Sequence, residues 1–125
     1  MRQEMLLSEF DRGERDFRGA DLRDADLEQA FLGGADLSGA DLGRARLGLA
    51  NLAWARLGGA SLTGADLSGS LLLFADLQGA DLQGARLDGA DLREADMHEA
   101  QVSAAQLAQA RSLEGATLPD GTKHV

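Results

Sequence analysis

Residues 20–99 read ADLRD ADLEQ AFLGG ADLSG ADLGR ARLGL ANLAW ARLGG ASLTG ADLSG SLLLF ADLQG ADLQG ARLDG ADLRE ADMHE, an unbroken run of five-residue units. Leucine or a close substitute holds the centre of every unit from Phe17 to Val102. Alanine stands two residues before that centre in every unit after the first, except at Ser70. A fixed period of this kind indicates a repeat architecture, in which each unit packs mainly on its neighbours.

A period of five fits neither a helix nor a straight strand. Along a helix, each step of five residues rotates the leucine by about 140° beyond a full turn, so no apolar stripe forms. Along a strand, an odd step points successive leucines to opposite faces. The chain must therefore turn inward once per unit, which brings the leucines and the alanines two positions earlier to a common interior. Glycine ends nine of the units, where a corner requires unusual backbone angles.

The repeated A-D-L-x-x pattern of residues 15–102 resembles the pentapeptide-repeat family. The corners alone leave open the number of units per coil and the hand of the coil. The resemblance implies an all-β solenoid: a right-handed quadrilateral β-helix with four units per coil, hence about four to five coils, and short helical caps. Known members, including the quinolone-resistance proteins, bind DNA gyrase as mimics of DNA.

The limits of the repeat predict three parts, an N-terminal cap at 1–14, the β-helix at 15–102, and a C-terminal helix and tail cap at 103–125. Met5, Leu6 and Phe10 have helical spacing, which favours a short helix over the first coil.

Beyond the repeat, Ser103 and Gln106 have the spacing of a capping box, so we predict a helix over about 103–111. Alternatively, residues 105–107 form one more repeat unit. The tail then carries the turn signal Pro-Asp-Gly at 119–121. It is similar to the C-terminal segment of many bacterial members of the family.

With twenty residues per coil, residues twenty apart stack in columns, and the residue before each leucine faces solvent. Two neighbouring columns make an expected acidic face of seven aspartates: Asp16, Asp36, Asp76, Asp96, Asp21, Asp41 and Asp81. A row of carboxylates can imitate the phosphates of DNA. The alternative is that Asp or Asn before Leu is the family's ordinary consensus, which tolerates turns and keeps the surface soluble. Interleaved arginines at Arg46, Arg56 and Arg86 favour this alternative.

The fourth side carries apolar residues on its outside. The three Phe and Trp residues that follow Phe17 all lie there, and Trp54 and Phe74 are twenty apart, so they should stack on adjacent coils. Clustered exposed aromatic residues usually mark an interface. Two alternatives would bury this patch without a partner: a flanking segment that folds over it, or a local bulge near Ser70. We expect an interface, for a second copy or another protein, built from Phe31, Leu49, Trp54, Leu71, Leu73 and Phe74.

No catalytic, metal or cofactor site is expected. The chain has no cysteine, only two histidines and no phosphate-binding glycine loop. A leucine-filled interior leaves no pocket, and carboxylates on a convex wall lack the unlike environments that acid–base pairs need. No apolar run approaches the about 18–20 residues that cross a bilayer, so we expect a soluble, cytoplasmic protein.

These observations predict a non-catalytic protein-binding scaffold. The net charge of −9 disfavours direct binding of nucleic acid and suits a basic protein partner. DNA gyrase or another type II topoisomerase is the most specific candidate partner that the resemblance implies. The alternative is a structural or assembly module that acts through the Trp54/Phe74 face.

Overall fold

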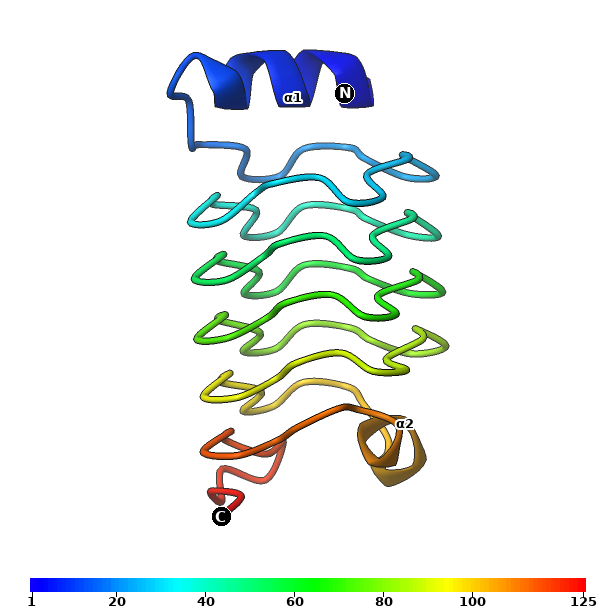
Figure 1. Ribbon diagram of the computed structural model, residues 1–125, viewed down its shortest axis with the longest axis vertical. Coiled ribbons are helices and arrows are strands. Elements are labelled where there is room, and N and C mark those ends of the chain that lie inside the picture. Colours follow the sequence, from blue (N-terminus) through cyan, green and yellow to red (C-terminus); the bar gives the residue numbers. More distant parts are fainter.

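The computed structural model describes residues 1–125 and shows a stack of coils with a helix near each end (Figure 1). Helix α1 (Gln3–Asp11) lies across the end of the stack where the chain begins. Helix α2 (Ala104–Ala108) lies at one side of the coils near the other end. Neither helix is long and apolar enough to cross a membrane.

The coils are joined by parallel bridges between residues twenty apart, from Asp16↔Asp36 to Asp81↔Gln101. Twenty residues are four units, so each coil has four sides, and the columns predicted from the sequence are confirmed. Each unit contributes one bridged residue rather than a longer strand. The right-handed sense of the coil stays a prediction from the family resemblance.

Each corner is a β-turn. The amide of Ala25, for example, donates to the carbonyl of Leu22 at 3.1 Å, which closes the turn. Its third residue, Asp24, has a φ of 60°, as a type II turn requires. Glycine fills most of these positions, since it adopts positive φ without a steric cost.

The interior is the stack of central leucines with the alanines beside them, which form one buried cluster, with Ala20, Ala30 and Val102 only partly buried at its edge. Ser70, the one exception to the alanine position, is fully buried, and its hydroxyl donates to the carbonyl of Leu67 at 2.7 Å. The next residue, Leu71, keeps its bridges to Asn51 and Asp91. The bulge considered near Ser70 is therefore absent, because the hydroxyl is satisfied inside an ordinary turn.

The first coil is covered by α1, whose Leu6 and Phe10 are buried against the core. Two of the three apolar residues noted in the sequence therefore face the core, whereas Met5 is 53% exposed. Without such a cover, the end of a solenoid exposes its core to water.

Helix α2 replaces the next unit of one side, because the column of Asp26, Arg46, Asp66 and Arg86 has no bridge beyond Arg86. Ser103 caps it in a complete capping box with Gln106, so the alternative of a further repeat unit at 105–107 is wrong. The side-chain amide of Gln106 also donates to the carbonyls of Leu82 and Ala85, at 2.7 and 2.9 Å. These bonds fasten the helix to the preceding coil.

The coil continues after α2, with a register changed by one residue. Asp91 bridges Ser112 and Asp96 bridges Thr117, a separation of 21 instead of 20. The column that begins at Asp16 therefore completes its fifth turn at Thr117. Parallel pairing thus extends beyond residue 102, into the segment expected to form only a cap.

Candidate protein-binding surface

One corner column carries two aromatic side chains where the fold favours glycine. Trp54 and Phe74 end their units with φ of 63° and 58°, and Gly34 holds the same position one coil earlier. The rings are parallel within 5° and their centroids are 4.4 Å apart. The exposed fractions are 64% for Trp54 and 45% for Phe74.

This arrangement is unfavourable for the isolated protein. A left-handed conformation costs a residue with a side chain about 1–2 kcal/mol relative to the right-handed region, whereas glycine has no such penalty. The stacked rings recover part of this cost through their mutual contact. Their outer surfaces nevertheless remain in water, which indicates a surface available to a partner.

The remaining apolar candidates divide into two groups. Leu71 and Leu73 are half-buried beside the stacked pair, and Leu49 is exposed at the preceding corner. Leu49 lies over Gly69, where an added Cβ would come within 2.8 Å of the leucine Cδ2. We call Trp54, Phe74, Leu73 and Leu49 the aromatic corner.

Phe31 differs from the other apolar candidates because it contacts the N-terminal helix. Its ring meets that of Phe10 edge-on, with centroids 6.1 Å apart, although 64% of the residue is exposed. Phe31 therefore also helps to hold α1 on the first coil.

A pocket of about 230 Å³ opens beside Phe74, lined by Leu73, Phe74, Arg93, Glu94 and Glu114. It lies on the same corner column as the aromatic pair, one coil further on. The amide of Phe74 donates to the carbonyl of Arg93 at 3.1 Å, and that of Glu94 to the carbonyl of Glu114 at 2.9 Å.

The acidic columns have a role in the turns. The Oδ1 atom of an aspartate before the central residue accepts the backbone N–H two residues later, as Asp76 does from Gln78 at 3.0 Å and Asp81 from Gln83 at 3.0 Å. This is an Asx turn, and asparagine can replace aspartate in it, as Asn51 does. The aspartates therefore have a structural reason to occupy these positions.

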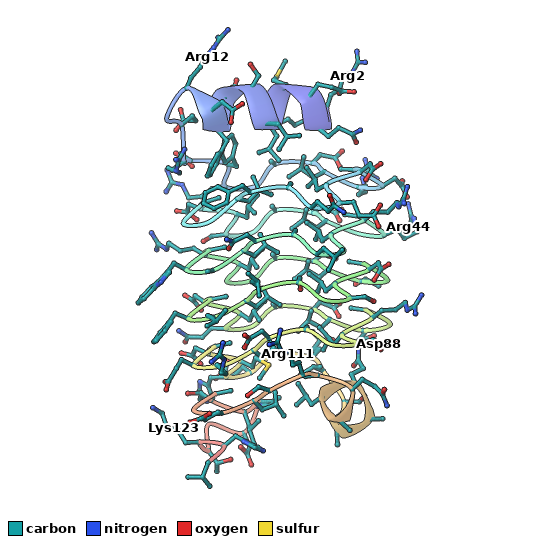
Figure 2. The ribbon with its side chains drawn as sticks, viewed as in Figure 1. Arg2, Arg12, Arg44, Asp88, Arg111 and Lys123 are labelled. Carbon is teal, nitrogen blue, oxygen red and sulfur yellow. The ribbon has the colours of Figure 1, made fainter.

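Arginines further reduce the charge of the acidic face in its N-terminal half. Arg18 forms two hydrogen bonds to Asp16, both at 2.9 Å, and Arg23 forms two to Asp21, at 2.8 and 2.7 Å. Asp36 and Asp41 are also within 4 Å of an arginine. Charged side chains of both signs project around the shaft, with Arg44 and Asp88 on the same side (Figure 2).

The other three aspartates of the predicted acidic face, Asp76, Asp81 and Asp96, have no ion pair. Asp76 and Asp96 are bridged neighbours, and Asp81 lies in the unit that follows that of Asp76 on the same coil. The unneutralised part of the acidic face is therefore confined to the C-terminal half of the shaft.

Asp91 is the one buried acid, with 2% of the residue exposed. Its carboxylate accepts three hydrogen bonds from the Arg93 side chain, from Nε at 3.0 and 3.2 Å and from Nη2 at 2.8 Å. The hydrogen bonds from Arg93 hold the pKa of Asp91 below its usual value, against the opposing effect of burial. The sequence Asp-Leu-Arg at 91–93 carried the signal for this pair, as it did at 21–23.

The ion pairs predict a response to acid. The hydrogen bonds from Arg18 lower the pKa of Asp16 to about 2, from an ordinary value of about 4. A carboxyl group whose pKa is lower in the folded than in the unfolded chain stabilises the fold at pH values above its unfolded pKa. This contribution to stability is therefore lost as the pH falls from about 4 to 2. We expect an NMR titration to place Asp16 near 2, and Arg18→Leu to return it toward 4. An unchanged titration in Arg18→Leu would contradict the ion pair.

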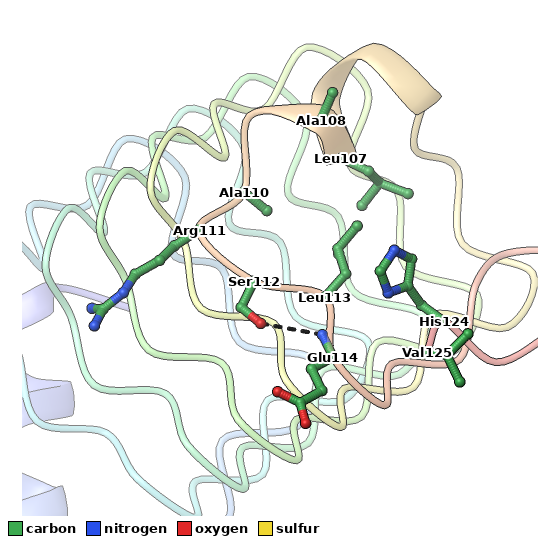
Figure 3. A pocket seen from close by; sticks show the side chains of 9 residues that line it. All are labelled: Leu107, Ala108, Ala110, Arg111, Ser112, Leu113, Glu114, His124 and Val125. Atoms are coloured by element: carbon green, nitrogen blue, oxygen red, sulfur yellow. Dashed lines mark hydrogen bonds between the residues drawn. The ribbon is translucent and has the colours of Figure 1, made fainter.

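A second open pocket, of about 510 Å³, lies between α2 and the C-terminal tail. Leu107, Ala110 and Leu113 form its apolar part, the ring of His124 borders it, and Arg111 points away from it (Figure 3). No group of three or more His, Asp or Glu side chains is arranged to hold a metal ion. This pocket is the incompletely covered end of the core, since Leu113 is only partly buried.

The family model for pentapeptide repeats, which describes eight copies of the repeat, matches residues 16–52, 50–87 and 75–111. The chain belongs to the pentapeptide-repeat family. Proteins of this family are generally non-catalytic structural or binding proteins. No curated protein sequence matches the chain.

Solved structures of other pentapeptide-repeat proteins resemble it. Rfr23 from the cyanobacterium Cyanothece 51142 shares 24% identity, with 98% of this chain and 99% of Rfr23 covered and a TM-score of 0.52, which shows the common fold. HetL, involved in heterocyst differentiation regulation in Nostoc sp. strain PCC 7120, shares 33% identity over 87% of this chain, with a TM-score of 0.39. The match spans 64% of the length of HetL.

QnrB1, a plasmid-mediated fluoroquinolone resistance protein, shares 17% identity in its full-length form. The match covers 84% of this chain and 68% of QnrB1, with a TM-score of 0.42.

Proposed function

We propose that this pentapeptide-repeat protein is a non-catalytic protein-binding scaffold whose partner contacts the aromatic corner. The observation that carries the proposal is the stacked, exposed pair of Trp54 and Phe74 at positions of positive φ. Large aromatic residues contribute most of the energy in many interfaces, because they bury a large area at a small entropic cost.

The shape of the molecule supports binding rather than catalysis. The interior is filled with leucine and alanine, and the acids stand in turns on a convex wall. Neither the pocket beside Phe74 nor the one beside α2 combines a nucleophile with a base oriented by a third group, as covalent catalysis requires. A rigid shaft with one aromatic corner instead presents a fixed surface to another macromolecule.

Site-specific photo-crosslinking tests the proposal. A benzophenone amino acid at position 74 keeps an aromatic ring at the corner, whereas the same group at exposed position 78 lies on another side. We expect one protein to crosslink at 74 and not at 78. Once purified, that protein should bind wild-type chain and lose about tenfold or more in affinity for Trp54→Ser, as expected for a binding hot spot. Equal crosslinking at 74 and 78 would contradict the proposal.

A second copy of the chain is one partner that this corner admits. Light scattering distinguishes the 13.1 kDa monomer from a dimer of twice that mass. A dimer that becomes a monomer in Trp54→Asp identifies a second copy as the partner. A dimer that persists in Trp54→Asp excludes the aromatic corner as the dimer interface.

DNA gyrase is a second candidate partner, favoured by the three unpaired aspartates Asp76, Asp81 and Asp96. Their carboxylates form a short acidic surface of the kind that can imitate DNA phosphates. This candidate also requires the cytoplasmic location predicted from the sequence. A supercoiling assay with and without a quinolone tests it: inhibition or protection that is lost in the triple Asp→Asn variant supports it, and no effect at micromolar protein excludes it.

A further inference from the structure

The pocket beside Phe74 has the chemistry of a site for a planar cation. Trp54 covers one face of the Phe74 ring, with parallel planes 4.4 Å apart at the centroids. Residues 54, 74 and 94 occupy one corner column on successive coils. The other face of Phe74 therefore turns toward the coil that carries Glu94, and this is the side on which the pocket lies.

The charges around this pocket leave two carboxylates unpaired. Arg93 lines the pocket, but its guanidinium is bound by the buried Asp91 through contacts of 3.0 and 2.8 Å. Glu94 and Glu114 are exposed, and neither has an ion-pair partner within 4 Å. Of the charged residues that line the pocket, two are carboxylates and one is a guanidinium, so its lining keeps one net negative charge.

We propose that this pocket receives an arginine side chain of the protein partner. Its guanidinium stacks on the free face of Phe74 and forms hydrogen bonds to Glu94 and Glu114. The face of an aromatic ring attracts a cation, and a planar guanidinium extends the stack of Trp54 and Phe74 as a third layer. The guanidinium of arginine also carries several N–H donors in one plane, so it can form hydrogen bonds to two carboxylates at once. The ammonium group of lysine lacks this planar set of donors.

The molecule contains this kind of contact once within itself. The guanidinium carbon of Arg15 lies 3.6 Å from the centroid of the Phe10 ring at the N-terminal end. Phe74 has an exposed ring and no arginine of its own chain over it, whereas the neighbouring Arg93 is held by Asp91. The overall charge of −9 further favours a basic partner by long-range attraction.

This inference rests on the proposed protein-binding role of the aromatic corner and specifies the chemistry of the partner. A dye-labelled hexa-arginine peptide is a suitable probe, with hexa-lysine for comparison, at about 0.15 M salt to screen general attraction. Anisotropy of the dye gives the affinity. Trp54 is the only tryptophan and the chain has no tyrosine, so a change in intrinsic emission places the bound peptide at this corner.

We expect hexa-arginine to bind more tightly than hexa-lysine and to change the Trp54 emission. Glu94→Gln and Phe74→Leu should each weaken its binding by about three- to tenfold, from the loss of a charged or cation–π contact. Glu99→Gln is the matched control, because Glu99 ends the next unit with a φ of 63°, close to the 60° of Glu94. Glu99→Gln should leave the affinity for hexa-arginine within about twofold of that of the wild-type chain, since an exposed charge outside the contact contributes little.

Three results would overturn the inference: equal weakening by Glu94→Gln and Glu99→Gln, equal affinity for the two peptides, or no binding of hexa-arginine. The first two show that the attraction comes from the general acidic surface, and the third shows that the pocket does not bind an arginine side chain. Photo-crosslinking at position 74 remains independent of this outcome. A partner that crosslinks at 74 while hexa-arginine fails to bind removes the arginine contact and leaves the proposed function in place.

Discussion

Replacing Leu62 by alanine lowers the free energy of unfolding by about 3–5 kcal/mol. Leu62 is fully buried in the middle of the stack, with Leu42 and Leu82 at the same position on the adjacent coils. Its amide donates to the backbone carbonyl of Asp81 at 2.7 Å, and the amide of Leu42 donates to the backbone carbonyl of Ser61 at 2.7 Å. These ladders hold the coils at a fixed spacing, so the interior cannot collapse into the space that the leucine leaves.

Chemical denaturation measures this effect, and Gln78→Ala is the control. Gln78 is exposed on the wall of the shaft, so its replacement should change stability by less than about 0.5 kcal/mol. A loss of less than about 1 kcal/mol in Leu62→Ala would show that the leucine stack does not form the core.

The second large effect is expected at the buried acid. Asp91→Ala should destabilise the fold by about 2–3 kcal/mol, because it removes charged hydrogen bonds and leaves Arg93 without its carboxylate. The side chain of Arg93 is 46% exposed, so water can solvate the freed guanidinium and the loss stays below that of a fully buried pair.

Two variants separate the ion pair from the turn. Asp91→Asn keeps a side-chain oxygen that accepts from the backbone amide of Arg93, as Asn51 accepts from Ala53 at 3.0 Å. This variant should therefore lose only the stability that comes from the ion pair with the Arg93 side chain. Asp81→Ala removes an Asx turn that has no ion pair and should cost about 0.5–1 kcal/mol. Equal losses in Asp91→Ala and Asp81→Ala, measured by denaturation, would show that the buried pair adds nothing.

The sequence predicted the coil well because one geometric rule repeats at every unit. A corner every fifth residue decides which side chains point inward, and the bridges at a spacing of twenty then fix the columns. The columns containing Asp16, Asp21 and Phe31 follow from this rule together with the four units per coil that the family resemblance implied. So does the stack of Trp54 on Phe74, since both end their units one coil apart.

The repeat pattern did not predict two features: the coil that resumes after α2, where the period is broken, and the ion pairs, which depend on the partner of each side chain. Leu113 and Leu118 are five residues apart and signalled that the coil resumes, but the one-residue shift introduced by α2 hides their register. Two of the neutralised acids were missed because the columns compare residues twenty apart, which reveals only pairs such as Arg56 with Asp36. The pairs of Asp16 with Arg18 and Asp21 with Arg23 instead join residues two apart within one unit.

The aromatic corner and the acidic surface depend on the same corners, so amide hydrogen exchange by NMR tests the central claim most directly. Central, corner and alanine amides donate to backbone carbonyls, as those of Leu57, Gly59 and Ala60 do at 2.7, 2.9 and 3.1 Å. Amides that follow the central residue have no backbone acceptor, as at Gly58, Thr63 and Leu73. We predict fast exchange at the amides of this kind that also lack an Asx acceptor, at residues 33, 48, 58, 63, 73 and 88, and slow exchange at the central and bridged amides between them. Continuous protection without these interruptions would contradict the coil and the surface built on it.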